Sequence, residues 1–450
     1  MNVLDWLVAN EWIAVDRLTL VMWGLVGFVA INIAAFSWRY LQGDSHRKTF
    51  FFKLIMMVLA LFVLVMADHF LLFLSAWALA NFLLSRLMIH NPGWPAARAS
   101  GNLALRSLGI GTAFLAIAFL VFYNLTGEYT LHGIVENEQG QPAASIGLAF
   151  VLMAAMSQSA IWPFHRWLLS SLNSPTPVSA IMHAGLVNGG GFLLARFAPL
   201  FLQQPSWLMI IFMLGLLTAI LGTLWKLMQS DIKRMLAAST MGQMGFMFLQ
   251  CGLGLFPAAV AHLCWHGLFK AYLFLASGDA AKEKRLNLGY PPPLKLLLPA
   301  LLSGALGAWC FAMVGYGHLS FSDSTLVLVA VAFMAGTQLS MPLLMNPTIG
   351  KILLVALITA ALGALYGLSV LAVEWALEPL GMMQAQPLQP LHLVAIIIFL
   401  SCWMALLYGQ RLLNRKALPA FILKLYVQQL NASQPHPQTV TAHRNQYSYK

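Results

Sequence analysis

Charged residues are scarce in this sequence. Asp, Glu, Lys and Arg make up 9% of its 450 residues, whereas soluble globular proteins carry about 25%. With 60% hydrophobic residues, a chain of this length cannot cover itself with a hydrated surface, and a soluble enzyme is excluded. Disorder is excluded because disordered chains have low hydrophobicity. A polytopic membrane protein remains, and the 34 glycines and 21 prolines fit that class.

Cysteine is also scarce, and its four copies form no CxxC pair. Their scatter excludes a disulfide framework, an iron–sulfur site and a structural zinc site. The sequence also lacks a phosphate-binding loop, a metal-ligand spacing and a serine nucleophile elbow. We therefore expect no cofactor in this chain, and a transport role rather than an enzymatic one.

Long hydrophobic runs are abundant. A membrane-spanning helix needs about 20 mostly apolar residues, and the alternating pattern of a membrane β-barrel is absent. The sequence therefore predicts an all-α fold with about thirteen transmembrane helices. The predicted spans are 18–38, 50–67, 70–89, 106–123, 143–162, 177–195, 206–228, 234–255, 257–277, 295–316, 324–345, 351–373 and 391–412.

The basic residues gather on one side of these spans. If the N-terminus lies outside, 22 of the 25 Lys and Arg fall in the cytoplasmic connections and tail, and 10 of the 14 acids fall outside. The positive-inside rule then predicts an outside N-terminus and a cytoplasmic C-terminus. We expect the membrane to be a bacterial inner membrane. The net charge of +11 thus reports topology and no nucleic-acid partner. The exceptions are Arg17, Arg196 and Lys270.

No second folded domain is expected, because the longest outside loop, about residues 124–142, is too short to fold alone. We expect residues 1–416 to form one transmembrane domain and residues 417–450 to form a cytoplasmic tail. The apolar stretch from Phe421 to Leu430 predicts a short interfacial helix. The rest of the tail, from Ser433, is predicted to be disordered.

The first functional candidates lie in the predicted span 257–277. His262, His266 and Lys270 are spaced i, i+4, i+8, which places them in a column on one helix face. Ionisable side chains inside a membrane are expensive and mark ion paths, so we interpret the column as a proton relay. The alternative is that Lys270 reaches an interface and the histidines make hydrogen bonds in the bundle core.

A second segment combines prolines with a lone histidine. Pro163, Pro175 and Pro177 are predicted to break or bound helices, and His183 follows them. Broken helices expose main-chain polar groups to buried paths in transporters, which makes His183 a candidate relay group. The alternative is an ordinary proline-marked loop before a small-residue packing helix.

A third segment begins with charges and continues as a polar stripe. Lys233 is a candidate relay group at the start of its helix. Asp231, Ser239 and Gln243, with Gln158 from the second segment, are candidate polar lining of the path. The alternative for the charges is a helix end that faces the cytoplasm.

These three segments together resemble a known superfamily. They resemble the antiporter-like subunits of respiratory complex I, Mrp-type Na⁺/H⁺ antiporters and membrane-bound hydrogenases, over about residues 15–280. The matching motifs are Ser159-Ala…Pro163…His165…Trp167, Pro175-Thr-Pro177-Val-Ser-Ala…His183-Ala, Asp231-Ile-Lys233-Arg234…Gly242-Gln243 and His262…His266-Gly-Leu-Phe-Lys270. The resemblance implies an antiporter-like fold with broken helices. It also implies relay roles for His183, Lys233, His262, His266 and Lys270.

Within the superfamily, the run Met182-His183-Ala-Gly-Leu-Val-Asn188 is most similar to the DabB family, the membrane subunits of DAB inorganic-carbon uptake systems. This resemblance implies a peripheral DabA-like partner that contains zinc. It also implies that a flow of H⁺ or Na⁺ through the membrane subunit drives hydration of CO₂ to bicarbonate in the partner. A complex I-like, hydrogenase or Mrp-type assembly is the alternative.

Two positions depart from the superfamily pattern. A glutamate usually follows the tryptophan of the early helix, but Ala78 follows Trp77 here, and Gln158 stands where a lysine is usual. The departures count against an ordinary Na⁺/H⁺ antiporter more than against a specialised subunit. They also leave open a third hypothesis, in which the chain is only a membrane anchor for its partner.

Overall fold

The computed structural model describes residues 3–137, 143–279, 294–345, 348–413 and 419–440. The described residues are mainly helical, and their only β-type pairings are isolated bridges. They cluster into two compact units, which we describe separately. Unit 1 is Met1–Gly252, His262–Ala281 and Gln429–Lys450, and unit 2 is Leu253–Ala261 and Lys282–Gln428.

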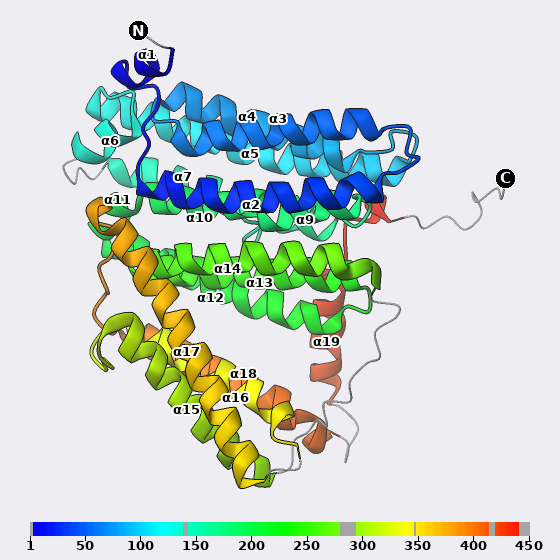
Figure 1. Ribbon diagram of the computed structural model, residues 1–450, viewed down its shortest axis with the longest axis vertical. Helices are drawn as coiled ribbons and strands as arrows, with labels where there is room; N and C mark the ends of the chain where they lie inside the picture. Colours follow the sequence, from blue (N-terminus) through cyan, green and yellow to red (C-terminus); the bar gives the residue numbers. More distant parts are fainter. Residues whose placement is uncertain (1–2, 138–142, 280–293, 346–347, 414–418, 441–450) are drawn as a thin grey trace, which may run out of the picture. The chain divides into compact units, whose positions relative to one another are not determined.

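Unit 1 contains long helices that run side by side (Figure 1), together with several short ones. Their order along the chain is α1 (Val3–Ala9), α2 (Arg17–Tyr40), α3 (Arg47–Met66), α4 (Phe70–Met88), α5 (Pro95–Thr126), α6 (Leu131–Asn137), α7 (Ala144–Gln158), α8 (Arg166–Leu169), α9 (Thr176–Ala184), η1 (Leu186–Asn188), α10 (Gly189–Arg196), α11 (Ala198–Leu202), α12 (Pro205–Met228), α13 (Ile232–Gly252), α14 (Phe256–Leu275), of which the part from His262 belongs here, η2 (Ala276–Asp279) and η4 (Pro437–Thr439).

Unit 2 is built on a second set of helices, in which α15 packs on both α16 and α17. Its helices are α15 (Leu294–Tyr316), α16 (Thr325–Leu343), α17 (Ile349–Leu377), η3 (Glu378–Leu380) and α18 (Pro390–Leu413), and most of α19 (Ala420–Ala432) also belongs to it. Its buried cluster includes Leu296, Met341 and Val355. None of the predicted site residues lies in unit 2.

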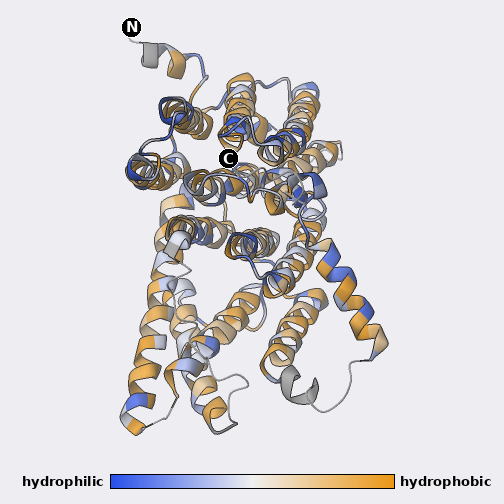
Figure 2. Cartoon of the chain, turned by 90° about the vertical axis from the view of Figure 1, so that its right-hand side faces the viewer, coloured by the Kyte–Doolittle hydropathy of each residue, from blue (hydrophilic) through white to orange (hydrophobic). Residues whose placement is uncertain are grey.

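The helices have the length and composition of membrane spans. Figure 2 shows hydrophobic residues along the long helices and hydrophilic residues gathered near helix ends and connections. Large apolar side chains such as Phe28 and Ile31 on α2 and Leu357 on α17 are exposed. A protein in water rarely exposes large apolar patches, whereas a lipid-facing surface must be apolar. The chain is a multi-pass membrane protein.

Eleven stretches of the described chain are long and apolar enough to cross a membrane. The predicted number, about thirteen, is therefore not confirmed. The two remaining predicted spans, 143–162 and 234–255, coincide with α7, which has only 15 residues, and with α13, which carries several polar side chains. The predicted all-α fold is confirmed, and the number of spans stays a prediction.

The predicted breaks in the helices are confirmed. Pro163 lies between α7 and α8, while Pro175 precedes the first residue of α9 and Pro177 lies in its first turn. The predicted span 177–195 is a broken helix, in which Gly185 separates α9 from η1 and α10. Asn188 repairs part of the break, since its Nδ2 donates to the Ala184 carbonyl at 2.7 Å.

Glycines bring α12 and α13 into close contact. A side chain at Gly222 would come within 2.3 Å of the main-chain nitrogen of Gly242, and one at Gly245 within 2.4 Å of the nitrogen of Ala219. Such small-residue contacts are typical of helix packing in membranes. They fix α13, which carries several of the candidate residues.

The tail is more ordered than predicted. The helix α19 covers the apolar stretch for which a helix is predicted, with Phe421, Leu423 and Leu425 exposed. Residues 433–440, predicted to be disordered, pack on unit 1, where Ser433 and Thr439 are buried. Hydrogen bonds to the α12–α13 connection, α13 and the α8–α9 connection explain this order.

Candidate functional site

The centre of the candidate site is Lys270 in α14. Its side chain is 1% exposed, and its Nζ donates a hydrogen bond of 3.1 Å to the main-chain carbonyl of Leu236 in α13. A lysine that reached an interface would expose its ammonium group, so this burial counts against the alternative interpretation of Lys270. A buried lysine bound to a neutral carbonyl is costly, which favours a role beyond packing.

His183 joins the same group from the end of α9. Its Nδ1 lies 3.0 Å from Oγ1 of Thr240 on α13, and the Thr240 hydroxyl donates to the Leu236 carbonyl at 3.0 Å. Because a hydroxyl has only one proton, His183 is the donor in this arrangement and keeps Nε2 as a proton acceptor. The His183 ring also stacks on Phe274, one helical turn beyond Lys270, at 4.2 Å.

The histidines of α14 continue the column away from Lys270. The rings of His262 and His266 are 6.1 Å apart and nearly parallel, at 12°. The Nε2 atoms of both are buried without a hydrogen-bond partner. Buried polar atoms are normally paired, and unpaired imidazole nitrogens beside a buried lysine are available for proton exchange. The alternative interpretation, in which the histidines make hydrogen bonds in the bundle core, would require a partner for each of these Nε2 atoms.

Gly267 explains why this face of α14 approaches the broken helix. A side chain at Gly267 would come within 2.8 Å of the Ala184 carbonyl. A buried histidine precedes each of these two residues in the chain: His266 precedes Gly267 on α14, and His183 precedes Ala184 on α9. The close approach thus brings the two histidine-bearing segments together.

Lys233 lies one turn before Leu236 on α13. It is half-buried, and its Nζ donates to the Ser174 carbonyl at 3.1 Å, just before α9. Each lysine therefore donates to a main-chain carbonyl. Lys233, at the start of α13, donates to Ser174, and Lys270 donates to Leu236, one turn further along α13. The structure brings together five predicted relay residues, in the order Lys233, His183, Lys270, His266 and His262.

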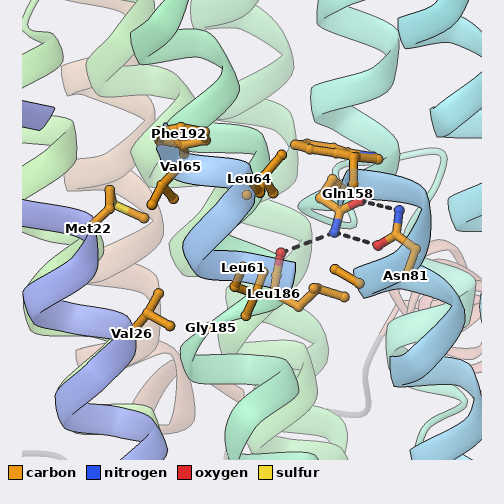
Figure 3. Close-up of a pocket in the computed structure, with 13 residues that line it drawn as sticks. Met22, Val26, Leu61, Leu64, Val65, Asn81, Gln158, Gly185, Leu186 and Phe192 are labelled. Carbon is orange, nitrogen blue, oxygen red and sulfur yellow. Dashed lines mark hydrogen bonds between the residues drawn. The ribbon is translucent and has the colours of Figure 1, made fainter. Parts of the chain in front are cut away.

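Gln158 takes part in a separate buried group, shown in Figure 3. Its Nε2 donates to Oδ1 of Asn81 at 3.0 Å and to the Leu186 carbonyl at 3.2 Å, while Nδ2 of Asn81 donates to Oε1 of Gln158 at 3.2 Å. The two amides thus form a reciprocal, uncharged pair. Asn81 lies on α4 about one turn beyond Ala78, the position where the superfamily pattern has glutamate.

A small cavity adjoins this amide pair. Its volume is about 20 Å³, and its wall includes Trp77, Asn81 and Gln158. This is room for a single water molecule. The Nε1 of Trp77 is buried without a hydrogen-bond partner. The amide group is therefore a tightly packed polar contact and no wide channel.

The other predicted lining residues lie outside the relay. Asp231 is exposed and its Oδ1 accepts the main-chain N–H of Arg234, so it caps α13. Ser239 is half-buried and Gln243 is exposed. None of the three takes part in the bonds that link Lys270, Thr240 and His183, and a lining role for them stays a prediction.

Sequence reasoning did not select Thr240, Asn81 or the Leu236 carbonyl as site groups. Thr240 carried a signal, since it lies in the polar stripe of α13 with Ser239 and Gln243. Nothing in the sequence marks a main-chain carbonyl. Within the described part of the chain, no group of three His, Cys, Asp or Glu residues is placed to hold a metal ion.

Two family models match the sequence. The model described as "NADH:quinone oxidoreductase/Mrp antiporter, TM" matches residues 67–301, which is more than half of the chain. The model described as "NADH-Ubiquinone oxidoreductase (complex I), chain 5 N-terminus" matches residues 8–51. The first match contains all five predicted relay residues.

Curated proteins also match the sequence. A probable inorganic carbon transporter subunit, DabB1 of Halothiobacillus neapolitanus, is 36% identical over 308 residues, covering 66% of this chain and 55% of that protein. The NADH-quinone oxidoreductase subunit L of Escherichia coli is 35% identical over 276 residues, covering 59% of this chain and 44% of that protein. The chain spans about half the length of the curated relatives it matches.

A solved structure of the Mrp complex from Dietzia sp. matches 93% of this chain and 52% of its own chain, with a TM-score of 0.62. At 21% sequence identity, this similarity shows the fold alone. The antiporter-like fold predicted from the sequence is therefore confirmed.

Proposed function

Because the chain belongs to the NADH:quinone oxidoreductase/Mrp antiporter family of membrane proteins, we propose that it conducts protons as the membrane subunit of an energy-coupled inorganic-carbon uptake complex. The observation that carries the proposal is the buried group in which Lys270 and Thr240 share the Leu236 carbonyl as acceptor and His183 bonds to Thr240. Stepwise proton transfer requires titratable side chains that lie close together.

The carbon substrate is supported by similarity. Several curated relatives at 32 to 37% identity are named as probable inorganic carbon transporter subunits. Each of them is a subunit by name, which supports a partner for this chain as well. We propose a peripheral, zinc-containing partner that hydrates CO₂, an inner-membrane location and a cytoplasmic C-terminus.

The neutral pair of Asn81 and Gln158 favours a specialised subunit. In an antiporter-like subunit these regions carry a glutamate and a lysine, whose charges can load and repel protons. In this chain two amides connect α4 and α7 by hydrogen bonds, without any charge. The ion path of this chain would then consist of the groups on α9, α13 and α14.

The alternative function is an ion-translocating subunit of a complex I-like, hydrogenase or Mrp-type assembly. The match to the Escherichia coli subunit favours it. The two functions predict different partners, because only the first requires a zinc-containing protein that hydrates CO₂.

Growth in air separates the proposals. The chain is expressed with its zinc-containing partner in a host that lacks carbonic anhydrase, and the same pair is expressed in a host that lacks Na⁺/H⁺ antiporters. We expect rescue of the first host and none of the second. Carbon uptake that persists after a protonophore collapses the gradient would overturn proton conduction and support a membrane anchor instead.

A further inference from the structure

A cavity opens at the end of unit 1 where α13 begins. Its volume is about 670 Å³, and its wall includes the α2–α3 and α4–α5 connections, the α8–α9 connection and Lys233. Polar and apolar side chains share this wall, among them Asn173 and Ser174. The cavity is large enough for many water molecules. Lys233 therefore faces a space that water can fill.

Three titratable side chains lie together on the same wall. The carboxylate of Asp44 lies between two imidazoles: Oδ2 is 2.8 Å from Nε2 of His90, and Oδ1 is 3.7 Å from Nδ1 of His46. The main-chain N–H of His46 also donates to Oδ1 of Asp44 at 2.7 Å. The exposed fractions of the side chains fall from 49% at His46 through 30% at Asp44 to 14% at His90. The cluster thus extends from bulk water into the protein.

Other charged groups also surround this cluster. Lys53 and Arg86 lie behind it, around a second cavity that also contacts His46 and His90. The guanidinium of Arg47 stacks over Trp38, and Arg234 next to Lys233 donates to Gln434 of the tail. Asp231 caps the start of α13, the helix that carries Lys233. Asp44 is the carboxylate on the wall of the larger cavity, and the hydrogen bond from His90 holds its pKa below the ordinary range.

The cavity connects this cluster with the relay. Lys233 lies on the cavity wall and donates to Ser174, and one turn further along α13 is Leu236, whose carbonyl holds Lys270. A proton that leaves Lys233 therefore enters the same water-accessible space that His90 and His46 contact. Under the predicted orientation this end of the bundle faces the cytoplasm.

We propose that Asp44, His46 and His90 form a proton-exchange site, through which Lys233 passes protons between the relay and bulk water. In the releasing direction, an N–H bond of the Lys233 ammonium breaks and water in the cavity carries the proton to a neutral imidazole. The imidazolium then gives its proton to bulk water and becomes neutral again. Uptake is the reverse sequence, and no oxidant or reductant is needed. The proposal rests on the proposed function, since it requires a proton path.

The structural alternative is that Asp44 and His90 only pin two connections together. The conservative variants Asp44→Asn and His90→Gln keep hydrogen-bonding groups at both positions, but an amide side chain does not take up or release protons as a carboxylate or an imidazole does. His132→Gln is a matched control, because His132 also pairs with a carboxylate, Glu136 at 3.1 Å, but is exposed on α6. That pair lies on neither cavity wall described above.

The test measures proton flux into vesicles of phosphatidylethanolamine and phosphatidylglycerol that contain the full chain with its partner. A potassium gradient with valinomycin sets the potential, and an internal dye reports pH in weakly buffered solution. We expect His132→Gln to match the wild type and Asp44→Asn/His90→Gln to slow the flux about tenfold. Imidazole at high concentration should restore that flux, since a small buffer molecule can enter the cavity and carry protons.

Each outcome decides the proposal. Slow flux that imidazole restores supports it, whereas slow flux that imidazole does not restore assigns a structural role to the cluster and overturns it. Normal flux in the double variant also overturns it, while the proposed function stands. Wild-type vesicles without proton flux overturn the proposed function, and the exchange site with it.

Discussion

Lys270 and Thr240 share one acceptor, the main-chain carbonyl of Leu236. The ammonium group donates to it at 3.1 Å and the hydroxyl at 3.0 Å. Through Thr240 the contact extends to His183, 3.0 Å further on. Two side chains from α9 and α14 are thereby connected through one turn of α13, and a change at any of the three positions should affect the others.

Replacement of Lys270 by Met should abolish carbon-dependent growth. Methionine has a similar length but no titratable group, so the bundle should still assemble while the relay is interrupted. We expect carbon uptake to fall by at least about 100-fold, with an unchanged amount of complex in the membrane. Growth and uptake are measured in the host that lacks carbonic anhydrase.

Lys351→Met is the matched control for Lys270→Met. The Nζ of Lys351 also donates to a main-chain carbonyl, that of Met345 at 2.6 Å, but this lysine is partly exposed at the start of α17. It should retain full uptake. Normal growth of the Lys270→Met strain would show that the relay does not pass through Lys270.

Replacement of Thr240 by Val removes the hydroxyl that connects His183 to the Leu236 carbonyl. Valine has the same shape, so packing is preserved, while the Nδ1 of His183 loses its partner. We expect proton flux to fall about tenfold and the melting temperature to decrease, because a buried polar atom is left unpaired. Thr240→Ser keeps the hydroxyl and should behave as the wild type. Equal flux in Val and Ser variants would contradict a role for this bond.

The amide pair of Asn81 and Gln158 should act as one structural unit. Single replacements by Ala remove one partner each and leave the other amide buried. A double-mutant cycle in detergent should give a coupling energy of about 0.5–2 kcal/mol, the range of hydrogen bonds between membrane helices. Additive losses of stability would show that the two amides are independent. Ser75→Ala and Asn124→Ala, each of which loses an exposed bond within its own helix, provide a control cycle without coupling.

The sequence predicts the relay residues better than their partners. The i, i+4, i+8 spacing is enough to place His262, His266 and Lys270 on one face, because a helix fixes the direction of its own side chains. It cannot identify the Leu236 carbonyl or Asn81, because those contacts depend on how separate helices pack. The end of the tail, from Ser433, is predicted to be disordered, whereas in the structure hydrogen bonds to residues more than 200 positions away order it.

Arg196 shows how an exception can guide such a prediction. The charge pattern leaves it on the side where basic residues are rare. In the structure it ends α10 and pairs with Asp16, which caps α2, and it also donates to Thr19 and to the Val65 carbonyl at 2.7 Å. The basic residue on the unexpected side is thus paired with a nearby acid.

The Asp16–Arg196 pair should make stability depend on pH. Burial raises the pKa of the Asp16 carboxyl, but the Arg196 charge and the hydrogen bonds from Thr19 outweigh this, so that pKa is below its ordinary value of 3.8. A carboxyl with a lowered pKa in the folded state stabilises above its ordinary pKa, and the stabilisation is lost as pH falls through the lowered value. Arginine stays charged throughout.

Asp16→Asn isolates this charge, since asparagine also caps helices well. We expect its melting temperature in detergent to be lower than that of the wild type by a constant amount between about pH 7 and pH 5, and the difference to shrink below about pH 4. Asp231→Asn, at an exposed helix cap, should show no such difference. A gap between wild type and Asp16→Asn that persists at the lowest pH would contradict the linkage.

The tail segment Gln429–Val440 should hold the start of α13 against the α8–α9 connection. Gln429 accepts from Trp225 on α12, Gln434 accepts from Arg234 on α13, and the Thr439 carbonyl accepts from Asn173. Each bond contributes about 0.5–1.5 kcal/mol. A chain that ends at Leu430 loses the two contacts to Arg234 and Asn173, so amide hydrogen exchange in residues 170–174 should speed up by at least about tenfold.

A chain that ends at Val440 keeps these contacts and serves as the control, with exchange rates equal to those of the full chain. The comparison also bears on function, because Asn173 lies next to Ser174, whose carbonyl holds Lys233. If the tail positions that carbonyl, proton flux should fall in the shorter chain and stay normal in the longer one. Unchanged exchange after removal of the segment would mean that the α8–α9 connection is held by its contacts within the helix bundle, such as the one from Asn173 to Ser100.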